Sequence, residues 1–211
     1  MMNRRFDARL AQRLDAPERM TWLPPWEVIA ALDVKQAEVI ADIGAGTGYF
    51  AMPLAEATGQ HGTVYAVDSQ EPMLEILRGK LASQGQGNIE AVFAEADATF
   101  LSSAQCDLVF FANVWHEFPD RSAVLRESRR ILKNLGRIAI LDWRPDVAPE
   151  HGPPLEHRLG AQSALAELQA AGFKQMSRKN IGKYSWLVQA VADREACGRP
   201  ASWRGTRTTP R

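Results

Sequence analysis

The chain has 211 residues, with 25 basic and 25 acidic side chains and therefore no formal net charge at pH 7. Its length suits one domain, and a composition that is 45% hydrophobic and 24% charged excludes a wholly disordered or coiled-coil chain. The zero net charge also weakens any bulk electrostatic argument for nucleic acid or an anionic membrane as an obligatory partner.

The two cysteines, Cys106 and Cys197, have no histidine or second cysteine at metal-ligand spacing, so we expect neither a metal site nor a disulfide. No apolar run approaches the roughly 20 residues that span a bilayer, and the amino terminus lacks the apolar core of a signal peptide. We therefore expect a cytoplasmic protein without metal, membrane or nucleic-acid partners. The oligomeric state stays open.

Short apolar runs alternate with amphipathic stretches, which is typical of a parallel α/β sheet. Strands are expected at residues 38–43, 63–68, 89–94, 107–113, 137–142, 174–181 and 184–192. Helices are expected at residues 48–58, from a cap at Ser69 onward, at 122–133 and at 162–171. Four prolines predict a long loop at residues 144–158, and loops of that length in a compact domain are usually functional or mobile.

We expect three regions in the chain. Residues 1–35 form an N-terminal helical lid segment, residues 36–192 form the main domain, and residues 193–211 form a disordered tail. The tail contains five arginines against two acids and has no apolar period, which favours a solvated segment.

The first expected strand leads from Asp42 into the glycines Gly44, Gly46 and Gly48. Such a turn has a backbone free of Cβ atoms, so a nucleotide-like ligand can approach closely. The dinucleotide pattern would place its third glycine at Tyr49, so the spacing disfavours a pyrophosphate ligand. A buried carboxylate at Asp42 would repel phosphate but suit a ligand that carries an ammonium group.

Asp68 ends the next strand, 20 residues after Gly48, where a carboxylate can accept both hydroxyls of a ribose. Other interpretations remain open at this point. Asp68 is also suited to cap the following helix, Asp97 to occupy a turn, and Asp42 to serve a structural role.

Taken with the segment from Glu95 to Ala98 and strands ending at Asn113 and Asp142, these motifs resemble the class I S-adenosylmethionine-dependent methyltransferases. The resemblance is strongest to the small enzymes of the ubiquinone/menaquinone-biosynthesis type and covers about residues 22–192. It implies an α/β, Rossmann-like class I methyltransferase fold with helices on both faces of a seven-stranded, mostly parallel sheet. The implied strand order is 3-2-1-4-5-7-6, with the seventh strand antiparallel.

The same resemblance implies S-adenosyl-L-methionine as cofactor and methyl transfer to a small-molecule acceptor. The residues implied at its methionyl part are Asp42, Gly44, Ala45, Gly46, Gly48 and Asn113. Asp68 is implied at the ribose, and Ser69, Asp97 and the Ala98 amide at the adenine.

The acceptor is expected beyond the carboxyl ends of strands four and five, where open α/β sheets bind ligands. His116 is a candidate base there, with Glu117 or Asp142 to orient it, so these three are the candidate catalytic residues. The alternative is that His116 and Glu117 only connect the strand to the next helix. Nearby tryptophans serve either for packing or as a wall for a planar acceptor. Phe6, Arg19, Trp22 and Trp26 are candidates for a lid over this site.

Two other functions compete with methyl transfer. Asp68 also suits an NAD(P)-dependent Rossmann oxidoreductase, although Tyr49 breaks the glycine pattern. The small number of evident catalytic groups also suits a regulatory protein that binds the cofactor without turnover.

Overall fold

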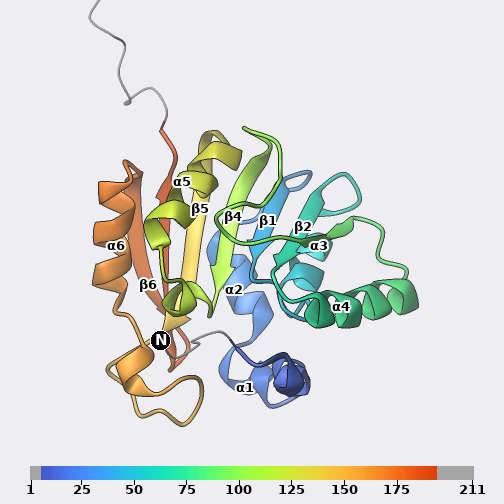
Figure 1. The fold of residues 1–211 in the computed structure, drawn as a ribbon, viewed down its shortest axis with the longest axis horizontal. Coiled ribbons are helices and arrows are strands. Elements are labelled where there is room, and N and C mark those ends of the chain that lie inside the picture. The colour runs from blue at the N-terminus through green and yellow to red at the C-terminus, as the bar shows by residue number, and fades with distance from the viewer. Residues whose placement is uncertain (1–5, 194–211) are drawn as a thin grey trace, which may run out of the picture.

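The computed structural model describes residues 6–193 as a seven-stranded sheet flanked by helices (Figure 1). The expected tail, apart from Asp193, lies outside the described residues. Within residues 6–193, no helix is both long and apolar enough to cross a membrane.

The strands follow the order β3-β2-β1-β4-β5-β7-β6. They comprise β1 Val39–Ile43, β2 Thr63–Asp68, β3 Ile89–Phe93, β4 Cys106–Ala112, β5 Leu132–Trp143, β6 Lys174–Ile181 and β7 Ser185–Val191. The first five pair in parallel, whereas β7 runs antiparallel to both of its neighbours. The predicted strand order and the antiparallel seventh strand are therefore confirmed.

Six α-helices and three short 3-10 helices accompany the strands in the described part of the chain. They are η1 Ala8–Leu14, α1 Arg19–Trp22, α2 Pro25–Leu32, α3 Ala51–Thr58, α4 Glu71–Gln84, η2 Trp115–Glu117, α5 Arg121–Ile131, η3 Leu155–His157 and α6 Ala161–Ala170. Apolar side chains of α5 and α6 pack on one face of the sheet, and those of α2, α3 and α4 pack on the other.

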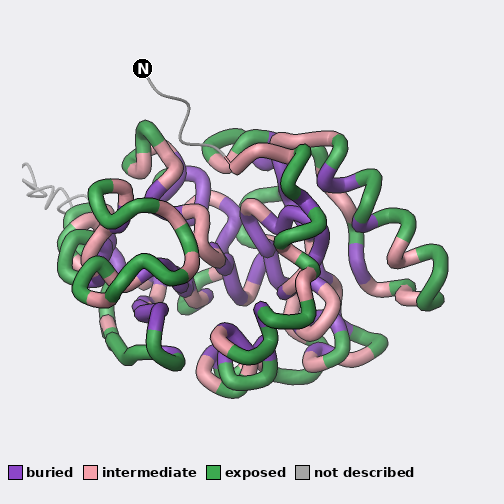
Figure 2. Tube along the Cα trace, turned by 90° about the horizontal axis from the view of Figure 1, so that it is seen from below, coloured by how far each residue is buried: buried purple, intermediate pink, exposed green. Residues whose placement is uncertain are grey.

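The central strands are buried on both faces, which explains their almost continuous apolar sequences. In β4, Leu108 contributes to the apolar cluster on one face and Val109 to that on the other, and both are fully buried. Figure 2 shows the consequence, with buried segments at the centre of the molecule and exposed ones on the surrounding helices.

The helix expected to begin at residue 48 begins at Ala51, and two further predicted boundaries were wrong. The helix expected to reach residue 133 ends at Ile131, because Leu132 adopts an extended conformation and pairs with Cys106 at the start of β5. The cap expected at Ser69 is replaced by Gln70, since Asp68 accepts the Gln70 amide N–H at 2.9 Å and α4 begins at Glu71. All three deviations are local and leave the order of elements unchanged.

The carboxyl ends of β1 to β5 lie at one edge of the sheet because these strands are parallel. This is the edge at which open α/β sheets bind ligands. The first described turns of the chain, in dark blue, and the orange loop after β5 lie at the same edge, which is the lower one in Figure 1.

Candidate active site

The glycine loop joins β1 to α3 and has the conformation that its sequence predicts. Gly44, Gly46 and Gly48 have φ values of 75°, 56° and 87°, a left-handed region that costs other residues energy. The amides of Gly44 and Ala45 donate to the carbonyl of Val67 at 2.8 and 3.0 Å. The loop is thereby fixed against the end of β2.

Asp68 lies at the end of β2, beside this loop, and is 8% exposed. Its Oδ2 accepts the Gly46 amide at 2.8 Å, and its Oδ1 accepts the Gln70 amide at 2.9 Å. A carboxylate has about four lone-pair sites, so a single aspartate can accept several donors at once. Ser69 is half-buried between Asp68 and Gln70.

Asp42 and Asn113 contribute buried polar atoms without partners among the described residues. These atoms are Oδ2 of Asp42 and both side-chain polar atoms of Asn113. Asn113 follows β4 with a φ of 59°, and its amide donates to the Leu141 carbonyl at 2.7 Å. Burial, together with the nearby charge of Asp68, raises the pKa of Asp42 to about 7. Unpaired buried polar groups are costly, so these atoms are candidates for contact with a bound ligand.

The segment after β3 holds Asp97 and Ala98, both exposed. The Ala98 amide, predicted to donate to adenine, here donates to the Glu95 carbonyl at 3.1 Å. The following residue, Thr99, donates through its amide and hydroxyl to Glu127 of α5 at 2.9 and 2.6 Å. These contacts hold the segment at the ligand edge, and the adenine contacts themselves stay a prediction.

His116 and Asp142 form a buried pair across the ends of β4 and β5. Nδ1 of His116 lies 2.9 Å from Oδ1 of Asp142, and the His116 amide donates to Oδ2 at 2.9 Å. His116 is 4% exposed and Asp142 is fully buried. On the other side of the ring, Nε2 lies 3.9 Å from Oε1 of Glu117. The three predicted catalytic residues are therefore together.

The electrostatics of this group suit proton transfer. Burial lowers the pKa of His116, but the charge and hydrogen bond of Asp142 and the charge of Glu117 outweigh it, so the pKa lies above its ordinary value. Burial raises the pKa of Glu117 to about 7, against the opposing effects of His116 and of the Phe6 amide. An imidazole whose Nδ1–H is held by a carboxylate presents Nε2 as the free base.

The described part of the lid segment contacts the glycine loop. Oδ1 of Asp15 accepts the Thr47 hydroxyl at 2.9 Å and the Lys80 ammonium at 2.6 Å. Lys80 also donates to the Thr47 carbonyl at 2.7 Å, which joins α4 to both segments. Sequence patterns missed Asp15, Thr47 and Lys80, because their contacts join positions more than 30 residues apart.

The same segment reaches the acceptor side through its backbone. The Phe6 amide donates to Glu117 at 3.1 Å, and the Phe6 carbonyl accepts from the Gln70 side chain at 3.0 Å. Two other predicted lid residues differ in exposure: Arg19 is buried, whereas Trp26 is 60% exposed. Trp26 therefore does not cover the site.

The loop at residues 144–158 folds over the end of β5. Arg158, 6% exposed, donates to the carbonyls of Pro153, Arg144 and His151, so one side chain organises the loop. Sequence analysis missed this role, since a single arginine beside prolines gives no periodic signal.

Of the nearby tryptophans, Trp22 stacks on His151 with ring centroids 4.6 Å apart and lies 5.4 Å from Trp143. Trp115 is fully buried against Phe111 and Phe118. Trp115 therefore packs in the core, and Trp22 joins the lid segment to the loop.

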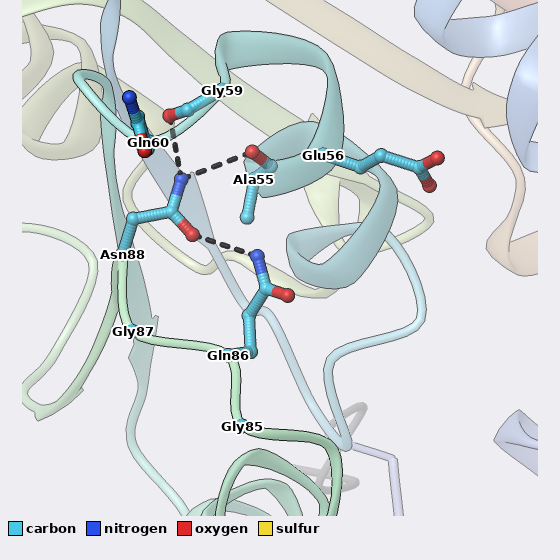
Figure 3. A pocket seen from close by; sticks show the side chains of 8 residues that line it. All are labelled: Ala55, Glu56, Gly59, Gln60, Gly85, Gln86, Gly87 and Asn88. Carbon is cyan, nitrogen blue, oxygen red and sulfur yellow. Dashed lines mark hydrogen bonds between the residues drawn. The ribbon is translucent and has the colours of Figure 1, made fainter.

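A hollow between α3 and the turns before β2 and β3 lies at the opposite, amino edge of the sheet (Figure 3). Its Asn88 side chain donates to the carbonyls of Ala55 and Gly59 and accepts from Gln86. These polar groups form hydrogen bonds with one another. The hollow is therefore a place where α3 is connected to the turn before β3.

The residues at the carboxyl edge fit S-adenosylmethionine. Oδ2 of Asp42 and Oδ1 of Asn113 lack partners among the described residues and are acceptors that suit the ammonium of a methionyl group. A Cβ added at Gly44 would lie 2.8 Å from the Val114 side chain, so this position of the glycine loop requires glycine. Asp68, beside the loop, matches the position of a ribose.

Comparisons with known proteins find similar methyltransferases. A family profile described as a methyltransferase domain matches residues 41–140. The chain is 29% identical over 155 residues to a demethylmenaquinone methyltransferase of Lactococcus lactis, covering 73% of this chain and 58% of that protein. It is also 29% identical to a ubiquinone/menaquinone biosynthesis C-methyltransferase of Francisella tularensis, covering 58% of this chain and 50% of that protein.

This chain thus spans only about half the length of the curated relatives it matches. A solved structure of a SAM-dependent methyltransferase from Aquifex aeolicus matches more fully, with a TM-score of 0.85 and 29% identity over 89% of this chain and 100% of that one. The fold and these similarities agree: the chain has the Rossmann-like class I methyltransferase fold and is similar to S-adenosylmethionine-dependent methyltransferases.

Proposed function

We propose that this protein transfers a methyl group from S-adenosylmethionine to a small-molecule acceptor whose proton passes to His116. The observation that carries the proposal is the buried Asp142–His116 pair beside Glu117, at the edge where the glycine loop ends. When bound, the cofactor supplies a methyl group already activated by a sulfonium centre. Positioning of the acceptor then provides much of the acceleration.

The chain's residues divide into two groups in this proposal. Asp42, Asn113 and the glycine loop, with Gly44, Ala45, Gly46 and Gly48, hold the methionyl part. Asp68 accepts the ribose hydroxyls, and Ser69, Asp97 and Ala98 adjoin the adenine. The described part of the lid segment, residues 6–35, covers the cofactor.

His116 is the proposed general base. Asp142 holds Nδ1–H and so fixes the ring and leaves Nε2 to accept the acceptor's proton. Asp142 also stabilises the imidazolium that forms. Glu117, whose pKa of about 7 allows either protonation state near neutrality, lies on the Nε2 side and orients the acceptor.

The acceptor is a small molecule rather than a nucleic acid, because the net charge of zero provides no electrostatic attraction for a polyanion. The buried free thiol of Cys106 suits a reducing compartment, so we propose a cytoplasmic location. Demethylmenaquinone, in its reduced form, is the first acceptor to test because relatives carry that name.

The proposal is tested by incubating the protein with methyl-labelled S-adenosylmethionine and reduced demethylmenaquinone. We expect acceptor-dependent formation of S-adenosylhomocysteine and a labelled product, both lost in His116→Ala. Binding of the cofactor without transfer to this acceptor or to simple phenols and amines would support the regulatory alternative instead.

A further inference from the structure

Arg19, the first residue of α1, is a buried cation without an acidic partner in contact. It is 7% exposed, and its Nη1 donates to the Leu14 carbonyl at 2.9 Å. Its guanidinium carbon lies 3.9 Å from the centroid of the Tyr49 ring. Among residues 6–193, no carboxylate oxygen lies within the 4 Å of an ion pair, although the charges of Asp15 and Asp42 act on it from farther away.

The remaining donors of the Arg19 guanidinium have no protein acceptor among the described residues, and none of them is a fully buried atom, so they face space open to a ligand or solvent. A buried guanidinium presents five N–H donors, of which the described hydrogen bonds employ one. Burial lowers the pKa of Arg19 to about 10, so the group still carries its charge at pH 7. Buried charges in folded proteins are usually paired, so an anion bound at the open donors would stabilise Arg19.

Arg19 lies next to the glycine loop. Leu14, whose carbonyl Arg19 binds, has its Cδ1 3.2 Å from the position that a Cβ on Gly46 would occupy. Tyr49 directly follows Gly48, the last glycine of the loop. The buried Asp42 carboxylate, with its unpaired Oδ2, is close enough to influence the pKa of Arg19.

The carboxylate of Asp42 and the guanidinium of Arg19 therefore both lie near the glycine loop, at the ligand edge of the sheet. A methionyl group carries both complementary charges, an ammonium and a carboxylate, on one carbon. We propose that Arg19 binds the carboxylate of the methionyl part of the cofactor, while Asp42 and Asn113 receive its ammonium. The proposal rests on the proposed function, because it requires an S-adenosyl ligand at this site.

The assignment also gives the lid segment a specific role. The planar fork of a guanidinium binds a carboxylate through two parallel hydrogen bonds, which a lysine cannot reproduce. Because α1 belongs to the lid segment, the bound carboxylate fixes that segment over the glycine loop. Binding of the cofactor thereby holds in place the segment that encloses it.

Calorimetry with three related ligands tests this contact. The ligands are S-adenosylhomocysteine, its decarboxylated analogue, which lacks only the carboxylate, and 5′-methylthioadenosine, which lacks the whole amino-acid part. We expect the wild type to bind S-adenosylhomocysteine about 10²-fold more tightly than the decarboxylated analogue, the scale of a charged, bidentate contact.

The variants Arg19→Met and Arg19→Lys should change this ratio and not merely the affinity. Arg19→Met keeps an apolar side chain over Tyr49 and should reduce the ratio to about 3-fold or less, whereas Arg19→Lys should keep roughly 10-fold through its charge. Arg13→Met, which removes an exposed arginine of the same segment, should retain the wild-type ratio.

The ratio separates a direct contact from a structural one. If Arg19 only supports Tyr49 and Leu14, its variants weaken all three ligands equally and the ratio stays at its wild-type value, which overturns the proposal. A wild type that does not discriminate between the first two ligands overturns it as well. A wild type that binds none of the three contradicts the proposed function itself.

Discussion

The Nδ1 atom of His116 lies 2.9 Å from Oδ1 of Asp142, a carboxylate with no exposed surface. The same carboxylate accepts the backbone amides of His116 and Trp143, at 2.9 and 2.8 Å. Asp142 thus fixes both the ring and the backbone after β4. This double attachment holds the imidazole in a fixed position, as general base catalysis requires.

Replacing His116 by alanine should lower turnover by roughly 10²–10⁴-fold, the usual scale for general acid–base catalysis, with little change in S-adenosylhomocysteine affinity. The wild-type rate should rise with pH, because only the neutral imidazole accepts a proton, and the midpoint should lie above the ordinary histidine pKa of 6.5. In Asp142→Asn the midpoint should move to lower pH, since the stabilising charge is lost.

The turnover rate measured as a function of pH, together with the melting temperature of each variant, decides whether His116 acts as a base. Normal turnover per folded molecule in His116→Ala, together with a lower melting temperature, would assign His116 a packing role and leave positioning alone as the mechanism.

Replacing Asp68 by alanine should weaken S-adenosylhomocysteine binding by about 1.5–3 kcal/mol, because two charge-assisted hydrogen bonds to ribose would be lost. Glu71→Ala is a suitable control, since it removes a partly exposed carboxylate at the start of α4. Calorimetry measures both. An unchanged affinity in Asp68→Ala would show that the ribose is held elsewhere.

Replacing Gly46 by valine should nearly abolish cofactor binding and leave the fold mostly intact. A φ of 56° is unfavourable for a branched residue, and its side chain would enter the ligand's volume beside Leu14. Gly79 in α4 is the matched control: a Cβ there meets nothing within 4 Å, so Gly79→Ala should stabilise the helix by roughly 0.5–1 kcal/mol. Circular dichroism and calorimetry follow both variants, and a folded Gly46→Val with normal affinity would remove this loop from the site.

Asp42 should make the ligand-free protein less stable as the pH rises. Its pKa is raised by burial from 3.8 to about 7, so its contribution is fully present below pH 3.8 and is lost as the pH rises to about 7. Compared with Asp42→Asn, which does not titrate, the wild type should lose up to about 4 kcal/mol over this range. Urea unfolding at several pH values measures the difference, and a constant difference would mean that Asp42 keeps its charge in the folded protein.

Much of the fold follows from local sequence patterns. The strands β1, β2 and β4 were predicted because buried parallel strands are nearly continuous apolar runs, and the strand order came from the family resemblance. The end of α5 was missed because Leu132 pairs with Cys106, a contact between residues that are 26 positions apart. Periodicity does not contain such information.

The residues of the candidate site also fall into those that local sequence patterns indicate and those that depend on distant contacts. Asp42, Asp68 and the glycines could be proposed from the sequence because they lie near or just beyond the end of a predicted strand. The contact of Asp15 with Thr47 and the burial of Arg158 were missed, since both depend on where a loop or terminal segment folds back over the sheet. Trp26 was expected in the lid from its position in the sequence, yet it is exposed.

The central claim is that the carboxyl edge of this sheet binds an S-adenosyl ligand. Titration of the wild-type protein with S-adenosylhomocysteine, and separately with NAD, tests it most directly. We predict saturable binding of one S-adenosylhomocysteine per chain and no binding of NAD at the same concentrations. Binding of NAD without binding of S-adenosylhomocysteine would contradict the claim and favour a Rossmann oxidoreductase.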